Sequence, residues 1–524
     1  MGLLWLQTQV LTLLSTGLAS GQYDYRPCAA RSLGKNQVVC VCNRTYCDNV
    51  EPVGDLRPGQ AVLYYSNDAG RRLEKSSLKP TANKTKNTLH LTLDSRIKFQ
   101  KMLGFGGAFT DSAGINLQSL PKSMQDSMLE GYYGSSGLQY TIGRVPIASC
   151  DFSTHEYSYA DDPDDFELAN FSLTIEDYQY KIPYLIQAQK LSQNKTKFFA
   201  SPWSAPAWMK TNGRMQGGGR LKGEEGGEYY KTWANHYVRF FEEYHKNGVD
   251  FWGLTIQNEP TSGSDPNYRW QTMYFNAEME RNFIKDLLGP ALKSSSYSKD
   301  LKLMINDDQR DTLPKWVDTV LNDPEAAKYV SGVAIHWYND RGVPASLLKT
   351  THQRHPDYFI LATEACNGYL PNEGIPILGD WKRAELYAID IIEDISNYVT
   401  GWVDWNLCLD MQGGPNWVKN FVDSPIIVNA AKQEYYKQPM WYAMGHFSKF
   451  VRPDSYRIKS LFEEAPPNGI RHVAFVTSNG YKVVVIANID DKSSQTISIR
   501  EVNNPTLHYN VVLEPHSLAT VIIN

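Results

Sequence analysis

The chain reads FWGLTIQNEP over residues 251–260 and YFILATEAC over residues 358–366. In each stretch a short apolar run, typical of a buried strand, leads to a glutamate: Glu259 in the first and Glu364 in the second. A polar residue at the carboxyl end of a strand in a parallel barrel points into the loop-lined mouth. The two stretches therefore predict two carboxylates at one face of such a barrel.

The rest of the chain supplies enough strands to close this barrel. Eight apolar runs end in polar or aromatic residues, namely 101–105, 138–142, 197–200, 251–256, 301–305, 330–335, 358–362 and 400–403. Helix-like stretches separate most of them, for example 233–245, 276–287 and 381–398. Alternating strands and helices predict parallel βαβ units, and eight units close a (β/α)₈ TIM barrel over residues 100–454. An open doubly wound sheet is the alternative, but it usually needs a G-x-G-x-x-G turn, which this sequence lacks.

Both ends of the chain have β-rich patterns instead. Strand-like runs at 473–477 and 481–486 flank an Asn-Gly hairpin signal, and further runs follow at 496–499, 508–513 and 518–523. Before the barrel, the runs 61–65 and 89–93 are too few to bury a core alone. We therefore expect residues 54–99 and 455–524 to form one all-β sandwich domain from both chain ends.

The first residues are those of a secreted protein. Residues 1–21 have an apolar run followed by Ala-Ser-Gly, which predicts a signal peptide; a buried first helix is the alternative. No later stretch has 18 uncharged apolar residues, so no membrane span is expected. Four N-x-[ST] sequons, predicted glycosylation sites, agree with secretion: Asn43, Asn83, Asn170 and Asn194.

A cysteine cluster follows the signal peptide. Cys28, Cys40, Cys42 and Cys47 predict two disulfides in an oxidising compartment, with three pairings open; a zinc site is the less favoured alternative. We expect a disulfide-bonded N-terminal β module over residues 22–53, with residues 407–438 packed on it. The other cysteines are Cys150, Cys366 and Cys408. Cys366 is close to Glu364, but a nucleophilic role is less expected than a small buried side chain.

Net charge, motif content and residue types limit the classes of function that the chain can have. A formal net charge of −5 and a pI near 6.2 argue against nucleic acid as a partner. No H-E-x-x-H motif is present, and Asn306-Asp307-Asp308 alone is weak evidence for a cation, so neither a metal nor a cofactor is expected.

The two carboxylates at the predicted strand ends, Glu259 and Glu364, suit glycosidic bond cleavage. Six tryptophans near the predicted strand ends offer faces for a sugar, unless they are core residues: Trp203, Trp208, Trp337, Trp402, Trp405 and Trp417.

Longer motifs along the chain support the sugar-cleaving function that the two carboxylates suggest. They are CVCN (40–43), GFGGA (104–108), RVP (144–146), ASCDF (148–152), ASPW (200–203), NEP (258–260), HWY (336–338), EAC (364–366), GGPNWV (413–418) and NFVDSPIIV (420–428). Together they resemble the lysosomal β-glucosidases of glycoside hydrolase family 30 over nearly the whole chain after the signal peptide. The resemblance implies a retaining β-glucosidase that hydrolyses glucosylceramide to glucose and ceramide. Residues 217–227 and 367–381 match only loosely, so the lipid half of the substrate has weaker support.

The resemblance also implies roles for individual residues. Glu259 would be the acid/base, Glu364 the nucleophile, and Asn258 a hydrogen-bond partner of the sugar 2-hydroxyl. Asp151, Trp203, Trp405 and Asn420 would line the glucose pocket, with Tyr338 near the nucleophile and Arg144, His336 and Phe152 in support. Two alternatives stay open: a family 30 hydrolase of other β-glycans, and a secreted glycan-binding homologue that has lost the chemistry.

A lipid substrate implies a membrane surface. The resemblance implies a lysosomal protein delivered through the secretory pathway, with secretion as the other destination, and peripheral on the lumenal membrane face. Its partners would be glucosylceramide in bilayers, anionic lipid, an activator of the saposin type and a sorting receptor. The apolar residues of one mouth loop are the candidates for lipid contact, unless they pack on the barrel: Tyr369, Leu370, Ile375, Ile377, Leu378 and Trp381.

Overall fold

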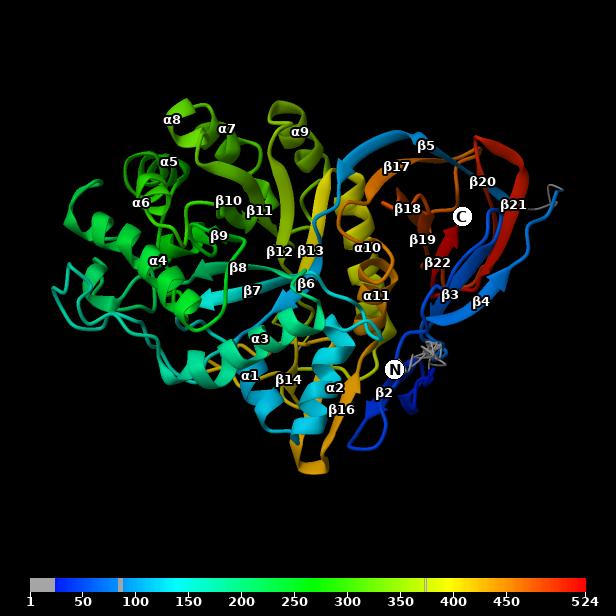
Figure 1. Ribbon diagram of the computed structural model, residues 1–524, viewed down its shortest axis with the longest axis horizontal. Helices are drawn as coiled ribbons and strands as arrows, with labels where there is room; N and C mark the ends of the chain where they lie inside the picture. The colour runs from blue at the N-terminus through cyan, green and yellow to red at the C-terminus, as the bar shows by residue number, and fades with distance from the viewer. Residues whose placement is uncertain (1–23, 83–87, 372, 374) are drawn as a thin grey trace, which may run out of the picture.

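A computed structural model describes residues 24–82, 88–371, 373 and 375–524. Eight parallel strands close into a barrel at the centre of the molecule (Figure 1). They are β6 (Gly104–Ala108), β7 (Ile142–Ile147), β8 (Lys197–Pro202), β9 (Gly253–Thr255), β10 (Lys302–Gln309), β11 (Val330–His336), β12 (Phe359–Glu364) and β13 (Val399–Asn406). β13 pairs with β6 and so closes the barrel, which confirms the predicted (β/α)₈ fold.

Two predicted strands have different boundaries. The apolar run 138–142 is mostly a buried connection in which Leu138 and Tyr140 pack, and β7 begins only at Ile142. The strand continues through Arg144, because a charged side chain can point into the polar mouth of the barrel. In the run 101–105, Lys101 belongs to the preceding strand β5 (Leu89–Lys101), and β6 starts at Gly104.

Helices surround the barrel (Figure 1). They are α1 (Asp111–Gln118), α2 (Lys122–Tyr133), α3 (Ile182–Leu191), α4 (Glu228–Lys246), α5 (Ala277–Phe283), α6 (Gly289–Ser294), α7 (Lys315–Leu321), α8 (Pro324–Ala327), α9 (Ser346–Arg354), α10 (Trp381–Ser396) and α11 (Pro439–Ser448). α4 buries Trp233, Tyr237, Phe240 and Tyr244, whose three- and four-residue spacing places them on one face. The predicted helix 276–287 is divided, because a π-helical segment, Ile284–Leu288, separates α5 from α6.

Both ends of the chain build the β-sandwich. Its nine strands follow the order β21-β20-β5-β17-β18-β19-β22-β3-β4. Besides β5 they are β3 (Ala61–Asn67), β4 (Glu74–Leu78), β17 (Tyr456–Phe462), β18 (Ile470–Val476), β19 (Lys482–Asn488), β20 (Gln495–Glu501), β21 (Asn504–Leu513) and β22 (Ser517–Ile523). β22 lies between β19 and β3, and β5 lies between β20 and β17, so N-terminal strands pair with C-terminal strands as predicted.

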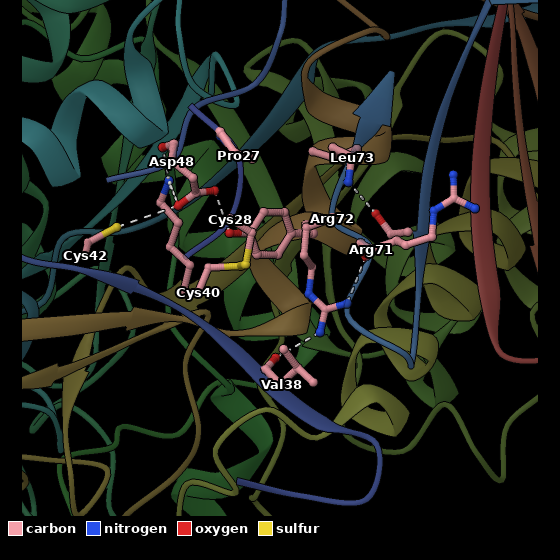
Figure 2. The surroundings of a disulfide bond; sticks show 12 residues. Pro27, Cys28, Val38, Cys40, Cys42, Asp48, Arg71, Arg72 and Leu73 are labelled. Atoms are coloured by element: carbon pink, nitrogen blue, oxygen red, sulfur yellow. Dashed lines mark hydrogen bonds and ion pairs between the residues drawn. A yellow bond between two sulfur atoms is a disulfide. The ribbon is translucent and has the colours of Figure 1, made fainter. Parts of the chain in front are cut away.

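A third sheet joins the N-terminal module to the chain after the barrel. Its order is β1 (Ala30–Gly34), β2 (Gln37–Cys42), β16 (Glu434–Lys437), β15 (Ile426–Asn429) and β14 (Leu409–Asp410). Two disulfides are present, Cys28–Cys40 (Figure 2) and Cys42–Cys47, and they select one of the three pairings. Buried Asp48 accepts hydrogen bonds from Lys437 Nζ through its carbonyl at 2.8 Å and from Tyr442 through Oδ2 at 2.7 Å.

Some predictions fall at the edge of the described chain. Residues 1–21 and the sequon Asn83 lie outside the described residues. Asn170 and Asn194 are exposed, whereas Asn43 is half-buried and accepts a hydrogen bond from the Thr45 amide at 2.9 Å. Cys150, Cys366 and Cys408 are free and buried. Among the described helices, none combines the length and apolar character needed to cross a bilayer.

Candidate active site

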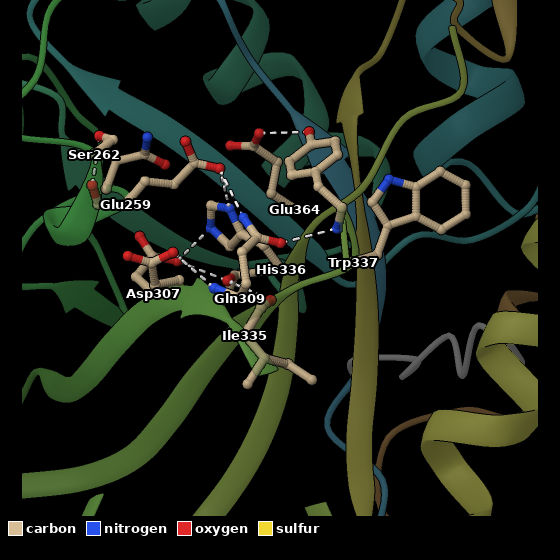
Figure 3. Close-up of polar contacts among 12 residues, drawn as sticks. Glu259, Ser262, Asp307, Gln309, Ile335, His336, Trp337 and Glu364 are labelled. Carbon is tan, nitrogen blue, oxygen red and sulfur yellow. Dashed lines mark hydrogen bonds and ion pairs between the residues drawn. The ribbon is translucent and has the colours of Figure 1, made fainter. Parts of the chain in front are cut away.

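Glu259 and Glu364, the two glutamates at the predicted strand ends, lie close together at the mouth of the barrel. Glu364 is the last residue of β12, and Glu259 lies four residues beyond the end of β9. A carboxylate oxygen of one lies within 4.8 Å of a carboxylate oxygen of the other (Figure 3). Glu259 has a left-handed backbone with φ of 41°, held by a 2.9 Å hydrogen bond from its amide to the Asp307 carbonyl. Such strained backbone persists only where surrounding contacts enforce it.

Arg144 and Tyr338 orient the Glu364 carboxylate. The Arg144 guanidinium, fully buried in β7, forms an ion pair with one oxygen, and the Tyr338 hydroxyl donates to the other at 2.6 Å. Burial raises the pKa of the Glu364 carboxyl, and Arg144 and His336 act in the opposite direction. Both oxygens therefore have fixed partners, which sets the direction in which the carboxylate points.

Glu259 receives hydrogen bonds from three side chains. His336 Nδ1 and Gln309 Nε2 contact Oε1 at 3.1 and 3.0 Å (Figure 3). The Tyr268 hydroxyl donates to Oε2 at 3.1 Å. Burial lowers the pKa of His336, but Glu364 and Asp307 outweigh it and raise the pKa to about 10. His336 is therefore an imidazolium whose two nitrogens both donate, one to Glu259 and one to Asp307.

Asp307 connects the two sides of the site. Its carboxylate accepts from Arg144 Nη2 at 2.8 Å, from His336 Nε2 at 3.0 Å, and from the Thr255 and Thr363 hydroxyls at 2.6 and 2.7 Å. Burial raises its pKa, but Arg144 and His336 dominate and hold the pKa well below its usual range. The sequence indicated Asp307 only as weak evidence for a cation. Its positively charged partners are instead two side chains of the protein, Arg144 and His336. Arg144 also contacts Glu364, and His336 also contacts Glu259.

A pocket of about 360 Å³ opens beside the two carboxylates. It is lined by Asp151, Phe152, Trp203, Asn258, Glu259, Trp270, Gln309, Tyr338, Asn339, Glu364, Cys366, Tyr369, Trp405, Asn420 and Val422. All six predicted substrate-binding residues and Phe152 are in this set. The supporting residues Arg144 and His336 lie directly behind it, in contact with the carboxylates.

The pocket combines aromatic faces with polar groups. Trp203 and Trp405 stack at 5.2 Å, and Phe152 meets Trp405 edge-on at 5.9 Å. Asp151 Oδ2 accepts from Asn416 and Asn420 at 3.1 and 3.0 Å, and burial raises the pKa of Asp151 to about 7. A concave site with apolar faces and a few convergent hydrogen-bonding groups suits a sugar ring.

Sequence reasoning missed several residues of the site. Gln309 follows Asn306-Asp307-Asp308 as the last residue of β10. Its place at the end of a barrel strand could have predicted a position in the site. Tyr268 and Trp270 lie in a loop without periodicity, where no pattern indicates a site. Of the six candidate tryptophans, only Trp203 and Trp405 line the pocket; Trp402, for example, is fully buried and packs on Tyr387.

Glu259, His336 and Glu364 are residue types that bind metals, and their ligand atoms lie within 4.8 Å of one another. These atoms are already in use, because Arg144 and Tyr338 contact Glu364 and Gln309 shares Glu259 Oε1 with His336. His336 also has both nitrogens directed at carboxylates. A metal would have to displace a buried guanidinium and an imidazolium, so these residues do not fit one.

Comparison with known proteins gives the family. Residues 102–451 match the glycosyl hydrolase family 30 TIM-barrel domain, and residues 454–521 match the family's β-sandwich domain. A Caenorhabditis elegans relative, "Putative glucosylceramidase 4", is 53% identical over 93% of each chain. The Mus musculus relative "Lysosomal acid glucosylceramidase" is 46% identical over 95% of each chain.

A comparison with solved structures also finds this fold. The crystal structure of SrfJ from Salmonella typhimurium is 28% identical and has a TM-score of 0.80, covering 88% of this chain and 99% of that one. A family domain thus spans most of the chain, and both carboxylates lie at the mouth of its barrel. The chain belongs to glycoside hydrolase family 30.

Proposed function

We propose that this glycoside hydrolase is a retaining β-glucosidase that cleaves glucosylceramide to glucose and ceramide. The observation that carries the mechanism is the approach of Glu259 and Glu364 oxygens to within 4.8 Å. Retaining enzymes hold their carboxyl groups about 5–5.5 Å apart, whereas inverting enzymes need about 6.5–9.5 Å to admit a water molecule. The short separation favours a double displacement.

In the first step, a Glu364 oxygen attacks the anomeric carbon while the bond from that carbon to the ceramide oxygen breaks. Glu259 donates its proton to the departing oxygen, which leaves a glucosyl ester on Glu364. In the second step, Glu259 takes a proton from water, and the water oxygen displaces Glu364. Arg144 and Tyr338 hold Glu364 for the attack, and His336, Gln309 and Tyr268 hold Glu259 near the leaving oxygen.

The close relatives support glucosylceramide as the substrate, since they are named glucosylceramidases. An Aspergillus fumigatus endo-1,6-β-D-glucanase is 27% identical over 83% of this chain, and so a soluble glucan is the competing substrate. We expect the purified protein to release glucose and ceramide from glucosylceramide at acid pH. We expect turnover of β-1,6-glucan oligosaccharides to be at least tenfold slower. Faster cleavage of the oligosaccharides would reject the lipid substrate, and no release from either would favour a glycan-binding protein.

The loop after β12 suits a membrane surface. Leu370, Ile375 and Ile377 are 36, 58 and 36% exposed. Met411, 40% exposed, lies in the neighbouring loop, where a side chain at Gly413 would touch Pro376. The four residues therefore lie on two adjacent loops, one of which also carries Tyr369 of the pocket lining.

Three of the predicted lipid contacts are not fully exposed. The prediction for Trp381 was wrong, because it is the first residue of α10 and is 2% exposed. Its indole nitrogen donates to Glu385 at 3.0 Å inside the fold. Tyr369 and Leu378 are half-buried.

We expect Leu370→Asp combined with Ile377→Asp to lower activity on glucosylceramide in anionic vesicles about tenfold or more. Each buried Leu or Ile side chain contributes about 1.5–3 kcal/mol of transfer free energy, and a charge at these positions removes it. Activity on a soluble aryl glucoside should stay within twofold. Ile175→Asp with Leu461→Asp is the matched control, since both residues are 61% exposed and lie elsewhere. A parallel loss on both substrates would show that the loop supports the pocket instead.

The remaining partners and the destination rest on the resemblance. We place the protein in the lysosome, peripheral on the lumenal membrane face and aided by anionic lipid. The mouse relative's name supports this location. An activator of the saposin type and a sorting receptor are the proposed protein partners.

A further inference from the structure

A second carboxylate cluster lies between the loop after β11 and helix α10. Asp340 is in the loop, and Asp390 and Asp394 are one helical turn apart on α10, so their side chains share a face. One oxygen of each lies within 4.8 Å of the others. The Asp340 and Asp394 side chains are only 7 and 1% exposed, and Asp390 is buried.

Arg310 does not balance this cluster. Its Nη1 lies 3.0 Å from Asp340 Oδ2 and 3.6 Å from Asp394 Oδ1. Its Nη2 is 3.0 Å from Glu393 Oε1, so the same guanidinium is shared with a further carboxylate. If all three aspartates are ionised, they carry three negative charges against one positive charge. Burying an uncompensated charge is costly, and a protein relieves the cost with a proton or a cation.

The aspartates also have oxygens without hydrogen bonds. Neither oxygen of Asp394 accepts a hydrogen bond from any described residue, whereas Asp340 has an ion pair with Arg310 and a hydrogen bond with Asp390. The neighbouring buried Asp404 and Asp423 differ, because Asp404 accepts from Tyr387 at 2.6 Å and Asp423 is paired with Arg383. Buried polar atoms without partners are uncommon in folded proteins, and an ion accounts for such atoms.

We propose that Asp340, Asp390 and Asp394 form a binding site for a divalent cation, and that calcium is the cation they fit. Calcium takes about 6–8 oxygen ligands at about 2.3–2.6 Å in a flexible geometry that an irregular carboxylate cluster can supply, whereas magnesium demands near-ideal octahedral geometry at about 2.0–2.1 Å. A divalent cation would also reduce the uncompensated charge, because the three aspartates and Glu393 otherwise face the single positive charge of Arg310. A cavity of about 140 Å³, lined by Asp340, Asp390 and Glu393 among others, provides an entry path and room for water ligands.

Protons compete for the same oxygens. The charged groups that face the cluster are Arg310 and Glu393, with Arg341 at the cavity wall. Because the cation must displace protons, its affinity falls as the pH falls. A bound cation would fix the loop to α10, and the same loop carries Tyr338, the hydroxyl donor to Glu364.

Terbium(III) and calcium test the site in the full-length protein. Trp402 donates from Nε1 to Asp390 Oδ2 at 2.9 Å, so terbium bound there should show luminescence excited through tryptophan. At pH 7 we expect millimolar calcium, more than magnesium, to quench this signal. Calorimetry should give one calcium per chain, and calcium should raise the Tm by about 2 °C or more, with a smaller shift at pH 5.

Variants identify the ligands. Asp390→Asn and Asp394→Asn should each remove the calcium shift, whereas the exposed control Asp286→Asn should keep it. Glu259→Gln should also keep it, which separates this cluster from the active-site carboxylates. A wild-type protein with no calcium response at pH 7 overturns the proposal without any variant, and the three aspartates then hold protons alone. An equal response in Asp394→Asn overturns it too, because the calcium would bind elsewhere.

Discussion

Replacing Glu364 with glutamine is expected to lower kcat on every β-glucoside by about 10⁴-fold or more, as loss of a covalent nucleophile does in other enzymes. Glutamine keeps the shape and can still accept from the Tyr338 hydroxyl, but it cannot form the glucosyl ester. The measurement is steady-state hydrolysis of an aryl glucoside, with the thermal unfolding curve as a check on folding. A variant that retains wild-type kcat would remove Glu364 from the mechanism.

Azide makes this test specific. In Glu364→Gly, azide can enter the space of the lost carboxylate and attack the anomeric carbon from the same face. One displacement inverts the centre, so the product should be α-glucosyl azide. The β anomer would mean that azide attacked an existing covalent intermediate, and a different residue would then be the nucleophile.

Glu259→Gln should discriminate between leaving groups. A lipid alkoxide is a poor leaving group that needs a proton, so turnover of glucosylceramide should fall by about 10²–10⁴-fold. Dinitrophenolate leaves without a proton, so formation of the glucosyl ester from its glucoside should be nearly unchanged and visible as a burst. Azide should then release β-glucosyl azide, because two displacements retain the centre.

Tyr268→Phe is the matched control for Glu259→Gln. It removes one hydrogen bond to Glu259 but leaves the carboxyl group in place. We expect a small loss that is similar for both leaving groups. If Glu259→Gln also slowed both substrates equally, the proton-donor role would be wrong.

The barrel was predictable because each of its strands is buried on both faces. Such strands read as short apolar runs, and the polar residue after each run lies at the mouth of the barrel. Glu259 and Glu364 therefore stood out. The start of β7 was misplaced because Leu138 and Tyr140 are equally apolar but pack in a connection, and burial alone does not distinguish the two.

Individual side-chain contacts between distant segments could not be predicted from the sequence. Asp307 matters because Arg144, Thr255, His336 and Thr363 converge on it from four other strands, and no local pattern shows this. The disulfide pairing likewise depends on which cysteines the folded chain brings together, and the sequence does not show this. Trp381 looked like part of an exposed loop, yet it begins a helix whose first turn is covered.

The interleaved sandwich has a consequence for synthesis on the ribosome. β3 ends at Asn67, and its partner β22 begins at Ser517, 450 residues later. At roughly 5–20 residues per second, β3 waits roughly 20–90 s before that partner is made. During this time its apolar side chains and unpaired backbone are open to wrong partners, so a chaperone has its main opportunity here. A chain that ended before Ser517 would leave β3 and β19 without the strand that joins them.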